Sequence, residues 1–261
     1  MKMTKIDRIP RELPAELLRL ADGAAVYDSS SSPEARVYFI ERDNGYFLKI
    51  GESGALGREA ELIERFNKLS LTSRVLHYST GERDIMLTER VAGKDLTDGT
   101  YLSDPKRLAA ALGENMRALH DIDTSSLDMP VRLGEYLGRA EDNYRTGNYD
   151  SSHFPDSFGY RSADEAHGVL LRGLDSLVAD TLIHGDYCFP NILFNDWKLS
   201  GYIDLGMAGI SDRHIDLFWG AWTLGFNLHT DEYRNIFFDA YGRDMIDEDK
   251  LLTVAAAEVF G

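Results

Sequence analysis

An acid, an amide and a second acid lie at fixed spacing in one short segment, and this spacing restricts the fold more than any other feature. Asp186 follows the apolar run 181–183, and Asn191 comes five residues later. Asp204 comes thirteen residues after the amide, at the end of a strand expected over 200–203. Short apolar runs bounded by Gly, Pro and Asp are typical of strands. The segment therefore predicts two polar loops, each held at the end of a strand.

These residue types fit phosphoryl transfer from Mg-ATP. That reaction needs one carboxylate to orient the acceptor hydroxyl, and a neutral oxygen donor with a second carboxylate to hold the metal on the phosphates. Asp186 fits the first role, and Asn191 and Asp204 fit the magnesium site. Because Asp186 already fills the acceptor-orienting role, we expect His184 to be a structural group that hydrogen-bonds nearby backbone. Cys188, the single cysteine, is expected to be a packed thiol and not a nucleophile.

The longer segment 184–216 resembles the core of the aminoglycoside 3'-phosphotransferases, within the protein-kinase-like small-molecule kinases. It reads HGDYCFPNILFNDWKLSGYIDLGMAGISDRHID. The resemblance extends more loosely over all 261 residues, including the acidic-aromatic ending 257–260. It implies an α+β, protein-kinase-like two-lobed fold with a small β-rich N-lobe and a larger helical C-lobe.

The expected secondary structure also changes along the chain, from mainly strands to mainly helices. The first part predicts a small sheet with one helix, with strands over 24–28, 36–40, 46–50, 75–78 and 84–88 and a helix over 56–69. Later residues predict helices over 104–120, 162–178, 214–226, 231–241 and 247–260. We therefore expect a nucleotide-binding N-lobe over 1–91, with a hinge at its end, and a helical C-lobe over 92–261 that carries the catalytic loop, the metal loop and the acceptor site.

Lys49 ends an apolar strand, where its ammonium would reach the α- and β-phosphates. Glu59 lies ten residues later, inside the following helix, and such a pair must meet in kinase-like folds for the nucleotide to be held productively. Glu61 is a competing partner, but two residues further along a helix it points to a different face. The sequence therefore predicts a Lys49–Glu59 pair.

The nucleotide site lacks a P-loop, because 51–57 has neither the lysine nor the hydroxyl that such a loop requires. By resemblance, the turn 30–35 with Ser32 would cap the β-phosphate. The segment 86–91 looks like the family's inter-lobe hinge, where adenine would meet the Thr88 carbonyl and the Arg90 N–H. Because backbone groups would recognise the base, ATP is expected and GTP stays open.

The resemblance places the acceptor contacts at Asp156, Glu258 and the terminal carboxylate of Gly261. In the family, acidic side chains bind the ammonium groups of the antibiotic. Four residues depart from the family's pattern, namely Phe189, Met207, Phe226 and Ala257. Fewer acids and more apolar surface predict a narrower or shifted acceptor spectrum. Trp219 and Trp222 are expected to lie in the core of their helix because of their apolar neighbours.

Composition limits the partners and the location. The formal charge of −16, from 44 acids and 28 bases, argues against a nucleic-acid partner and is compatible with a small cationic substrate. The chain has no run of about 18 apolar residues and no apolar core of signal-peptide type near its start, so no membrane partner and a cytoplasmic location are expected. Both a monomer and a dimer remain open.

The sequence thus predicts an enzyme, an ATP-dependent phosphotransferase that moves the γ-phosphoryl group to a hydroxyl of an aminoglycoside, at its 3' position. One alternative is a kinase of another small hydroxylated metabolite or antibiotic on the same scaffold. A second alternative is a nucleotide-binding protein without useful catalysis. Loss of Asp186, Asn191 or Asp204 would indicate that second alternative, and all three are present.

Overall fold

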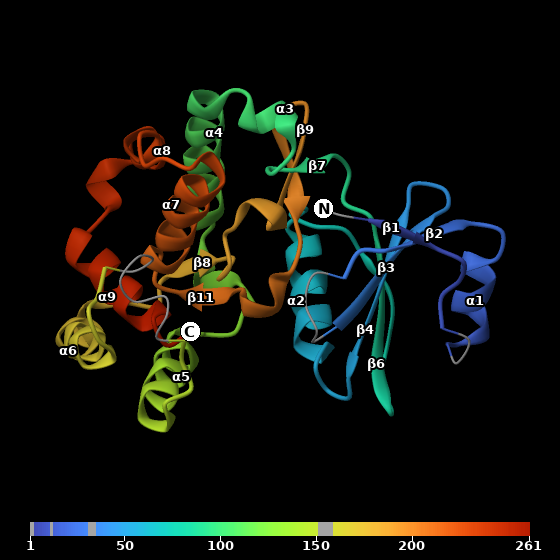
Figure 1. The fold of residues 1–261 in the computed structure, drawn as a ribbon, viewed down its shortest axis with the longest axis horizontal. Coiled ribbons are helices and arrows are strands. Elements are labelled where there is room, and N and C mark those ends of the chain that lie inside the picture. Colours follow the sequence, from blue (N-terminus) through green and yellow to red (C-terminus); the bar gives the residue numbers. More distant parts are fainter. Residues whose placement is uncertain (1–2, 11–12, 31–34, 151–158) are drawn as a thin grey trace. The chain divides into compact units, whose positions relative to one another are not determined.

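The computed structural model describes residues 3–10, 13–30, 35–150 and 159–261 (Figure 1). The chain divides into two compact units. Unit 1 comprises Met1–Thr97 and Pro190–Gly206, and unit 2 comprises Asp98–Phe189 and Met207–Gly261. Unit 1 is rich in strands and unit 2 is mainly helical, so the fold is α+β as the sequence predicts. Which unit binds which substrate stays a prediction.

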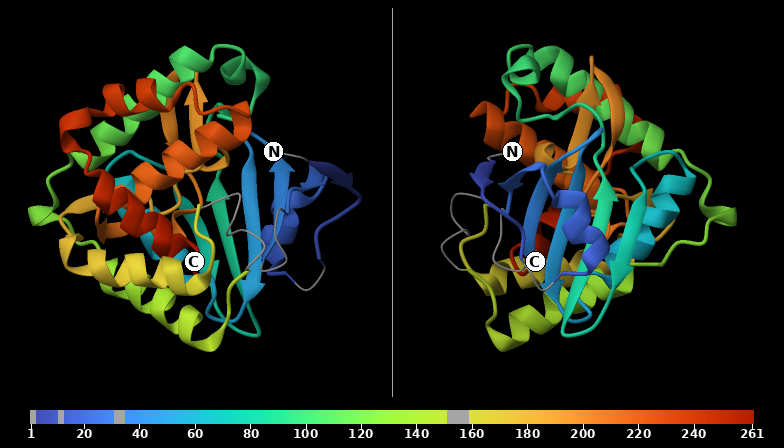
Figure 2. Two further views of the ribbon diagram at one scale, coloured as in Figure 1. Left: turned by 60° about the vertical axis from the view of Figure 1, so that its left-hand side comes forward. Right: turned by 90° about the vertical axis from the view of Figure 1, so that its right-hand side faces the viewer.

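Unit 1 is built on an antiparallel sheet of six strands in the order β1-β2-β3-β4-β6-β5. The strands are β1 (Thr4–Ile6), β2 (Ala25–Asp28), β3 (Ala35–Glu41), β4 (Tyr46–Glu52), β5 (Val75–Ser79) and β6 (Arg83–Glu89). Helices α1 (Ala15–Ala21) and α2 (Gly57–Lys68) lie on opposite faces of this sheet (Figure 1). Leu17 of α1 packs with apolar strand residues such as Ile40 and Leu48, and Figure 2 shows α1 lying across the strands.

A second, smaller sheet carries the later segment of unit 1. Its order is β10-β9-β7, with β7 at Lys94–Asp95, β9 at Ile192–Asn195 and β10 at Lys198–Tyr202. Tyr202 N–H donates to the Leu71 carbonyl at 2.8 Å, and the Thr72 hydroxyl donates to the Tyr202 carbonyl at 2.7 Å. These bonds tie β10, and with it the following Asp204, to the chain just after α2.

In unit 2, the first residues of the longest helix determine where it begins, and a close contact with another helix determines its position. Helix α4 (Pro105–His120) has proline at its first position, and the Asp104 side chain caps it by accepting from Arg107 N–H. It packs against α8 (Arg234–Tyr241) so closely that a Cβ on Gly113 would lie 2.4 Å from the Phe237 carbonyl oxygen. Only glycine allows this approach of the two helices.

The other helices of unit 2 are α3 (Gly99–Leu102), α5 (Leu133–Thr146), α6 (Ala163–Gly173), α7 (His214–Leu228) and α9 (Glu248–Glu258). Residues from α5, α6, α7 and α9 share one apolar core that includes Tyr136, Leu170, Ile215 and Val254. A two-stranded sheet of β8 (Thr181–Ile183) and β11 (Gly209–Ser211) leads into the expected catalytic loop.

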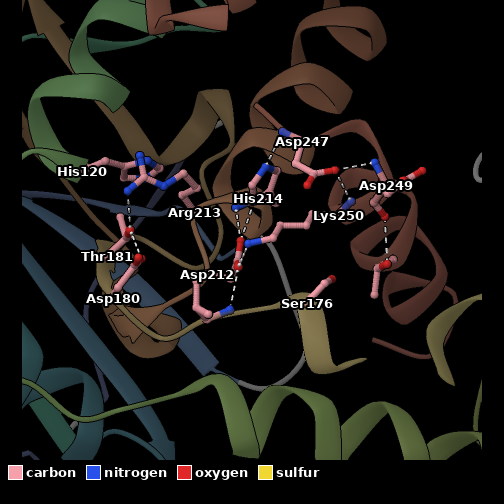
Figure 3. Close-up of polar contacts among 12 residues, drawn as sticks. His120, Ser176, Asp180, Thr181, Asp212, Arg213, His214, Asp247, Asp249 and Lys250 are labelled. Carbon is pink, nitrogen blue, oxygen red and sulfur yellow. Dashed lines mark hydrogen bonds and ion pairs between the residues drawn. The ribbon is translucent and has the colours of Figure 1, made fainter. Parts of the chain in front are cut away.

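The starts of α7 and α9 are joined by a buried polar cluster (Figure 3). The Asp212 carboxylate accepts from His214 Nδ1 at 2.6 Å and from Val178 N–H at 2.8 Å, and His214 Nε2 accepts from Asp247 N–H at 2.9 Å. Burial alone would raise the pKa of Asp212, but the hydrogen bonds from His214 and Val178 outweigh it and lower that pKa to about 2. These hydrogen bonds fix the position of the start of α9 relative to the start of α7.

Most expected elements are present, and the differences have local causes. The helix expected over 162–178 ends at Gly173 and continues as a 3-10 turn, Leu174–Ser176. A Cβ on Gly173 would collide with Thr253, so the chain lies too close to α9 for an ordinary side chain. Helices α1 and α5 and strand β1 had no counterpart in the sequence expectations. Across the described part of the chain, no helix combines the length and apolar character needed to cross a membrane.

Candidate active site

In unit 1, three charged side chains meet where β4, α2 and the end of β10 come together. The Lys49 ammonium lies 2.7 Å from Glu59 Oε2 and 3.5 Å from Asp204 Oδ1. Glu61, the competing partner, is exposed and lies 4.0 Å from Arg65 on its own helix. The structure therefore pairs Lys49 with Glu59.

Burial and charge act in opposite directions on this pair. Burial alone would lower the pKa of the Lys49 ammonium, but the carboxylates of Glu59 and Asp204 outweigh burial and raise that pKa above its ordinary value. Burial raises the pKa of Glu59 by more than the Lys49 ammonium lowers it. Lys49 is thus held as a cation next to carboxylates, and a cation in such a position can bind phosphate oxygens.

Asn191 and Asp204 are brought together by the backbone. Ile203 N–H donates to the Asn191 carbonyl at 3.0 Å, so the residue before Asp204 is bonded to Asn191. Asp204 has a φ of +57°, in the left-handed region that few side chains adopt, and this turns the chain between β10 and the 3-10 turn Leu205–Met207. Magnesium is usually bound by one or two carboxylates together with substrate phosphates and water. An amide and a carboxylate at this place fit that set of oxygen donors.

In unit 2, a buried carboxylate holds the loop that carries Asp186. The Asp216 carboxylate of α7 accepts from His184 N–H at 2.7 Å, from Gly185 N–H at 2.8 Å and from His120 Nε2 at 3.2 Å. Gly185 has a φ of +84°, and a Cβ there would lie 2.3 Å from the Met207 carbonyl oxygen. The loop therefore follows a path that glycine and Asp216 together define.

The expected structural role of His184 is confirmed. Its ring is fully buried, and its Nδ1 accepts from Asp186 N–H at 3.2 Å. Cys188 N–H donates to the Asp186 carbonyl at 2.8 Å, which closes the turn around Asp186. Burial, and then the Asp186 carboxylate, raise the pKa of the Cys188 thiol. The thiol is therefore protonated at neutral pH and is a packed group, as predicted.

The far end of the same loop is bound to α7. Phe189 N–H donates to the Thr223 hydroxyl at 3.1 Å, and both residues are buried. Phe189, one of the four departures from the family's pattern, is therefore a core residue. Thr223 had no signal in the sequence, because a threonine inside an apolar helix usually bonds only its own backbone.

Glu258 lies at the end of α9, buried between two other helices. Its Oε1 accepts from the Tyr136 hydroxyl of α5 at 2.9 Å and from Trp219 Nε1 of α7 at 3.2 Å. Among the described residues, no group donates a hydrogen bond to Oε2. Burial raises the pKa of Glu258 to about 7. Gly261 is exposed, and its N–H donates to the Glu258 carbonyl at 3.3 Å.

A cavity of about 560 Å³ opens between the start of α5 and the base of the loop. Its lining includes Arg132, Tyr136, Gly185, Met207 and Ser211. Arg132 is buried, pairs with Glu135 at 2.9 Å, and places Nη2 3.8 Å from Met207 Sδ. The guanidinium of Arg132, the residue before α5, thus reaches the side chain of Met207, one of the four departures from the family's pattern. The Ser211 hydroxyl is buried and has no hydrogen-bond partner within the described ranges.

Several predicted site residues are not placed by the structure as expected. Ser32 and Asp156 lie outside the described residues. Arg90 N–H already donates to the Gly45 carbonyl at 3.0 Å, which counts against its expected bond to adenine. Thr88 lies in β6, opposite Phe47 of β4, and its contact with adenine stays a prediction.

Comparisons of the sequence identify the class of protein. The chain belongs to the phosphotransferase enzyme family, whose model matches residues 30–252. A probable aminoglycoside 3'-phosphotransferase of Lactococcus lactis subsp. lactis is 44% identical over 251 residues, which cover 96% of this chain and 95% of the relative. An aminoglycoside 3'-phosphotransferase of Niallia circulans is 28% identical, with 92% of this chain and 94% of the relative covered.

Solved structures share the fold. An aminoglycoside 3'-phosphotransferase of type VIII matches with a TM-score of 0.75 and 24% identity, covering 92% of this chain and 94% of the other. An aminoglycoside phosphotransferase of Streptomyces rimosus, in complex with ADP and streptomycin, matches with a TM-score of 0.72 and 20% identity. That match covers 86% of this chain and 90% of the other. The kinase-like α+β fold expected from the sequence is therefore confirmed.

Replacing Asp216 with alanine should destabilise the protein, because the N–H groups of His184 and Gly185 would be left buried without an acceptor. We expect a loss of about 2–5 kcal/mol, measured as a lower denaturation midpoint in urea. Asp175→Ala, which removes an exposed acid from the 3-10 turn after α6, is the matched control and should change stability by less than about 0.5 kcal/mol. Equal midpoints for the two variants would contradict the role given to Asp216.

Proposed function

We propose that this protein transfers the γ-phosphoryl group of ATP to a hydroxyl of an aminoglycoside, at the 3' position. The observation that carries the proposal is the position of Lys49, which is ion-paired with Glu59 and lies 3.5 Å from Asp204. The names of the Lactococcus and Niallia relatives support the acceptor, and the ADP and streptomycin bound by the Streptomyces enzyme support both substrates.

The residues of unit 1 would bind the nucleotide. Lys49, fixed by Glu59, would neutralise charge on the α- and β-phosphates, and the Thr88 carbonyl would accept from adenine. Asn191 and Asp204 would hold Mg²⁺, and the bound ion would neutralise charge on the phosphates as the transfer proceeds. Ser32 would contribute from the turn before β3. Backbone recognition of the base leaves GTP as an alternative nucleotide.

Asp186 would act on the acceptor. Its carboxylate would orient the acceptor hydroxyl toward the γ-phosphorus and accept the hydroxyl proton as the new oxygen–phosphorus bond forms and the bond to the ADP oxygen breaks. His184 and Asp216 do not touch the reacting atoms and would act by fixing the loop. Most of the rate enhancement would come from positioning and electrostatics.

The acceptor would be a small cation bound in unit 2. Glu258 offers an oxygen, Oε2, to which no described residue donates a hydrogen bond, and the cavity of about 560 Å³ adjoins Gly185, the residue before Asp186. Asp156 and Gly261 would add contacts. The net charge of −16 attracts a polycation and disfavours nucleic acid. We infer a cytoplasmic enzyme, the compartment that supplies ATP.

Asp186→Asn should abolish turnover while leaving nucleotide binding intact, because it removes only the group that orients the acceptor. Purified parent and variant would be incubated with Mg-ATP and a panel of aminoglycosides and other hydroxylated amines, with added phosphate detected by mass spectrometry. We expect kcat to fall by about 10²-fold or more for Asp186→Asn. Asp204→Asn should instead also weaken nucleotide binding in the presence of magnesium.

Two results of this panel would contradict the proposal. Turnover by Asp186→Asn within a few-fold of the parent would remove Asp186 from its role. If the parent phosphorylates uncharged alcohols efficiently and no aminoglycoside, the acceptor assignment is wrong, and the protein is a kinase of another small hydroxylated molecule.

Lys49→Ala should raise the KM for ATP by about 10- to 100-fold, because charge-assisted bonds to the phosphates are lost. The KM for the acceptor should stay nearly constant. Glu59→Ala should have a similar effect, and the double change should cost less than the sum of the two single changes, since the residues act as a pair. Glu61→Ala is the matched control on the same helix and should leave both KM values unchanged. Additive losses would show that the ion pair does not hold the nucleotide.

The acceptor KM should fall as pH rises through about 7, because Glu258 attracts an ammonium group only when it is deprotonated. Below that pKa the KM should increase by up to about tenfold per pH unit. Glu258→Gln should give a high acceptor KM that does not change with pH in this way. Because the substrate is the same for both proteins, a comparison in the same buffers separates the titration of Glu258 from the titration of the substrate's amines. The raised pKa also means that the folded protein binds the proton more tightly than the unfolded chain, so the contribution of Glu258 to stability is lost as pH rises from about 4.5 to 7.

A further inference from the structure

One face of α7 links the loop of Asp186 to the buried carboxylate of Glu258. Trp219, Trp222, Thr223 and Phe226 have the spacing that places residues on one side of a helix. The Trp219 indole donates to Glu258, and the Thr223 hydroxyl accepts from Phe189 at the end of the loop. Trp222 and Phe226 therefore belong to the same helix face as both of these attachments.

The aromatic side chains on this face form a continuous series that leaves the core. The rings of Trp219 and Trp222 meet edge to face, with centroids 5.4 Å apart. Trp222 and Phe226 are stacked, with centroids 4.8 Å apart and planes inclined by only 11°. Trp219 packs against the core of α5, α6 and α9, whereas Phe226 is 61% exposed. Both tryptophans, which the sequence predicts to lie in the core, are partly buried, and Trp219 packs against the core of α5, α6 and α9.

Contacts at the start of α7 and at Trp219 keep this arrangement in place. Asp212 and His214 tie the start of α7 to Asp247 at the start of α9 (Figure 3). Eleven residues after Asp247, Glu258 then lies beside Trp219. The helix that carries the stacked rings is therefore attached to α9 through Trp219 and to the loop of Asp186 through Thr223.

We propose that Trp222 and Phe226 form a stacking platform for a sugar ring of the acceptor. The inference rests on the proposed function, and it names the part of the acceptor that this site selects. A pyranose has an apolar C–H face that can cover an aromatic ring, and its amino groups can reach a neighbouring carboxylate. An acceptor whose hydroxyl lies at Asp186 and whose ammonium group lies at Glu258 would lie along the face of α7 that carries Trp219 and Thr223, with Trp222 and Phe226 next to them on the same helix face.

The platform includes one of the four family departures. At position 226, one of the four departures from the family's pattern, this chain has a phenylalanine that is stacked and exposed. An aromatic face selects an acceptor by the shape of its ring, whereas a carboxylate selects it by charge. We expect acceptors with few ammonium groups and an uncovered ring face to be preferred over heavily charged ones.

Steady-state kinetics of Phe226→Ala and Trp222→Leu test the platform. Both changes should raise the acceptor KM by about 3- to 10-fold and leave the KM for ATP within about twofold, since ring stacking is lost and the nucleotide site is untouched. Leu171→Ala, which removes another exposed apolar side chain from α6, is the matched control and should change neither value. Thermal midpoints equal to that of the parent would show that Phe226→Ala folds normally.

A second variant, Phe226→Glu, tests selection by ring shape. It should lower the KM for the most highly charged aminoglycosides of the panel and raise it for those with the fewest amino groups. Quenching of tryptophan fluorescence on acceptor binding should be weaker in Trp222→Leu than in the parent.

The outcomes separate this inference from the proposed function. If the parent phosphorylates aminoglycosides but Phe226→Ala and Trp222→Leu keep the parent's acceptor KM, the platform is wrong and the proposed function stands. If Phe226→Ala keeps the acceptor KM but changes the oligomeric state in analytical ultracentrifugation, the exposed rings are a contact between copies of the chain, and the platform is again wrong. If no aminoglycoside is phosphorylated by the parent, the proposed function fails, and the platform fails with it.

Discussion

The Asp216 carboxylate is the interaction on which the geometry of unit 2 depends. It is fully buried, and it receives hydrogen bonds from two consecutive backbone N–H groups of the loop and from His120. His120 in turn accepts from the Tyr241 hydroxyl of α8 at 2.9 Å. A charge in such surroundings is stable only when its hydrogen bonds are complete, so the loop, α4, α7 and α8 are coupled through one group. The position of Asp186 is therefore a property of the packed helices.

Unit 1 uses the opposite arrangement, in which a cation is surrounded by carboxylates. Lys49 is mostly buried between Glu59 and Asp204, and the two acids keep it charged. The side chain of Asp204 remains more than half exposed, so it can still bind a ligand while it balances the lysine. Buried groups in both units thus fix the backbone, and more exposed oxygens stay available for chemistry.

The parts that the sequence predicted best are those whose signal is local. The Lys49–Glu59 pair and the helices α4 and α7 are confirmed by the structure, and each has its signal in a short stretch of chain. Tyr136 and Thr223 could not be found in this way, because their roles come from contacts across 122 and 34 residues. Arg90 shows the converse case. The sequence predicted that its N–H would bond to adenine, but in the fold this N–H donates to the Gly45 carbonyl. Long-range hydrogen bonds carry no signature in the sequence near either partner.

The contact between Gly185 and residue 207 has a consequence for how such a protein can diverge. Gly185 packs against the carbonyl of Met207, which every amino acid possesses, so the course of the loop does not depend on which side chain stands at 207. A substitution at position 207 can therefore change the side chain beside the Arg132 guanidinium while the loop keeps its course. The side chain that borders the cavity can then vary without a change in the backbone that carries Asp186.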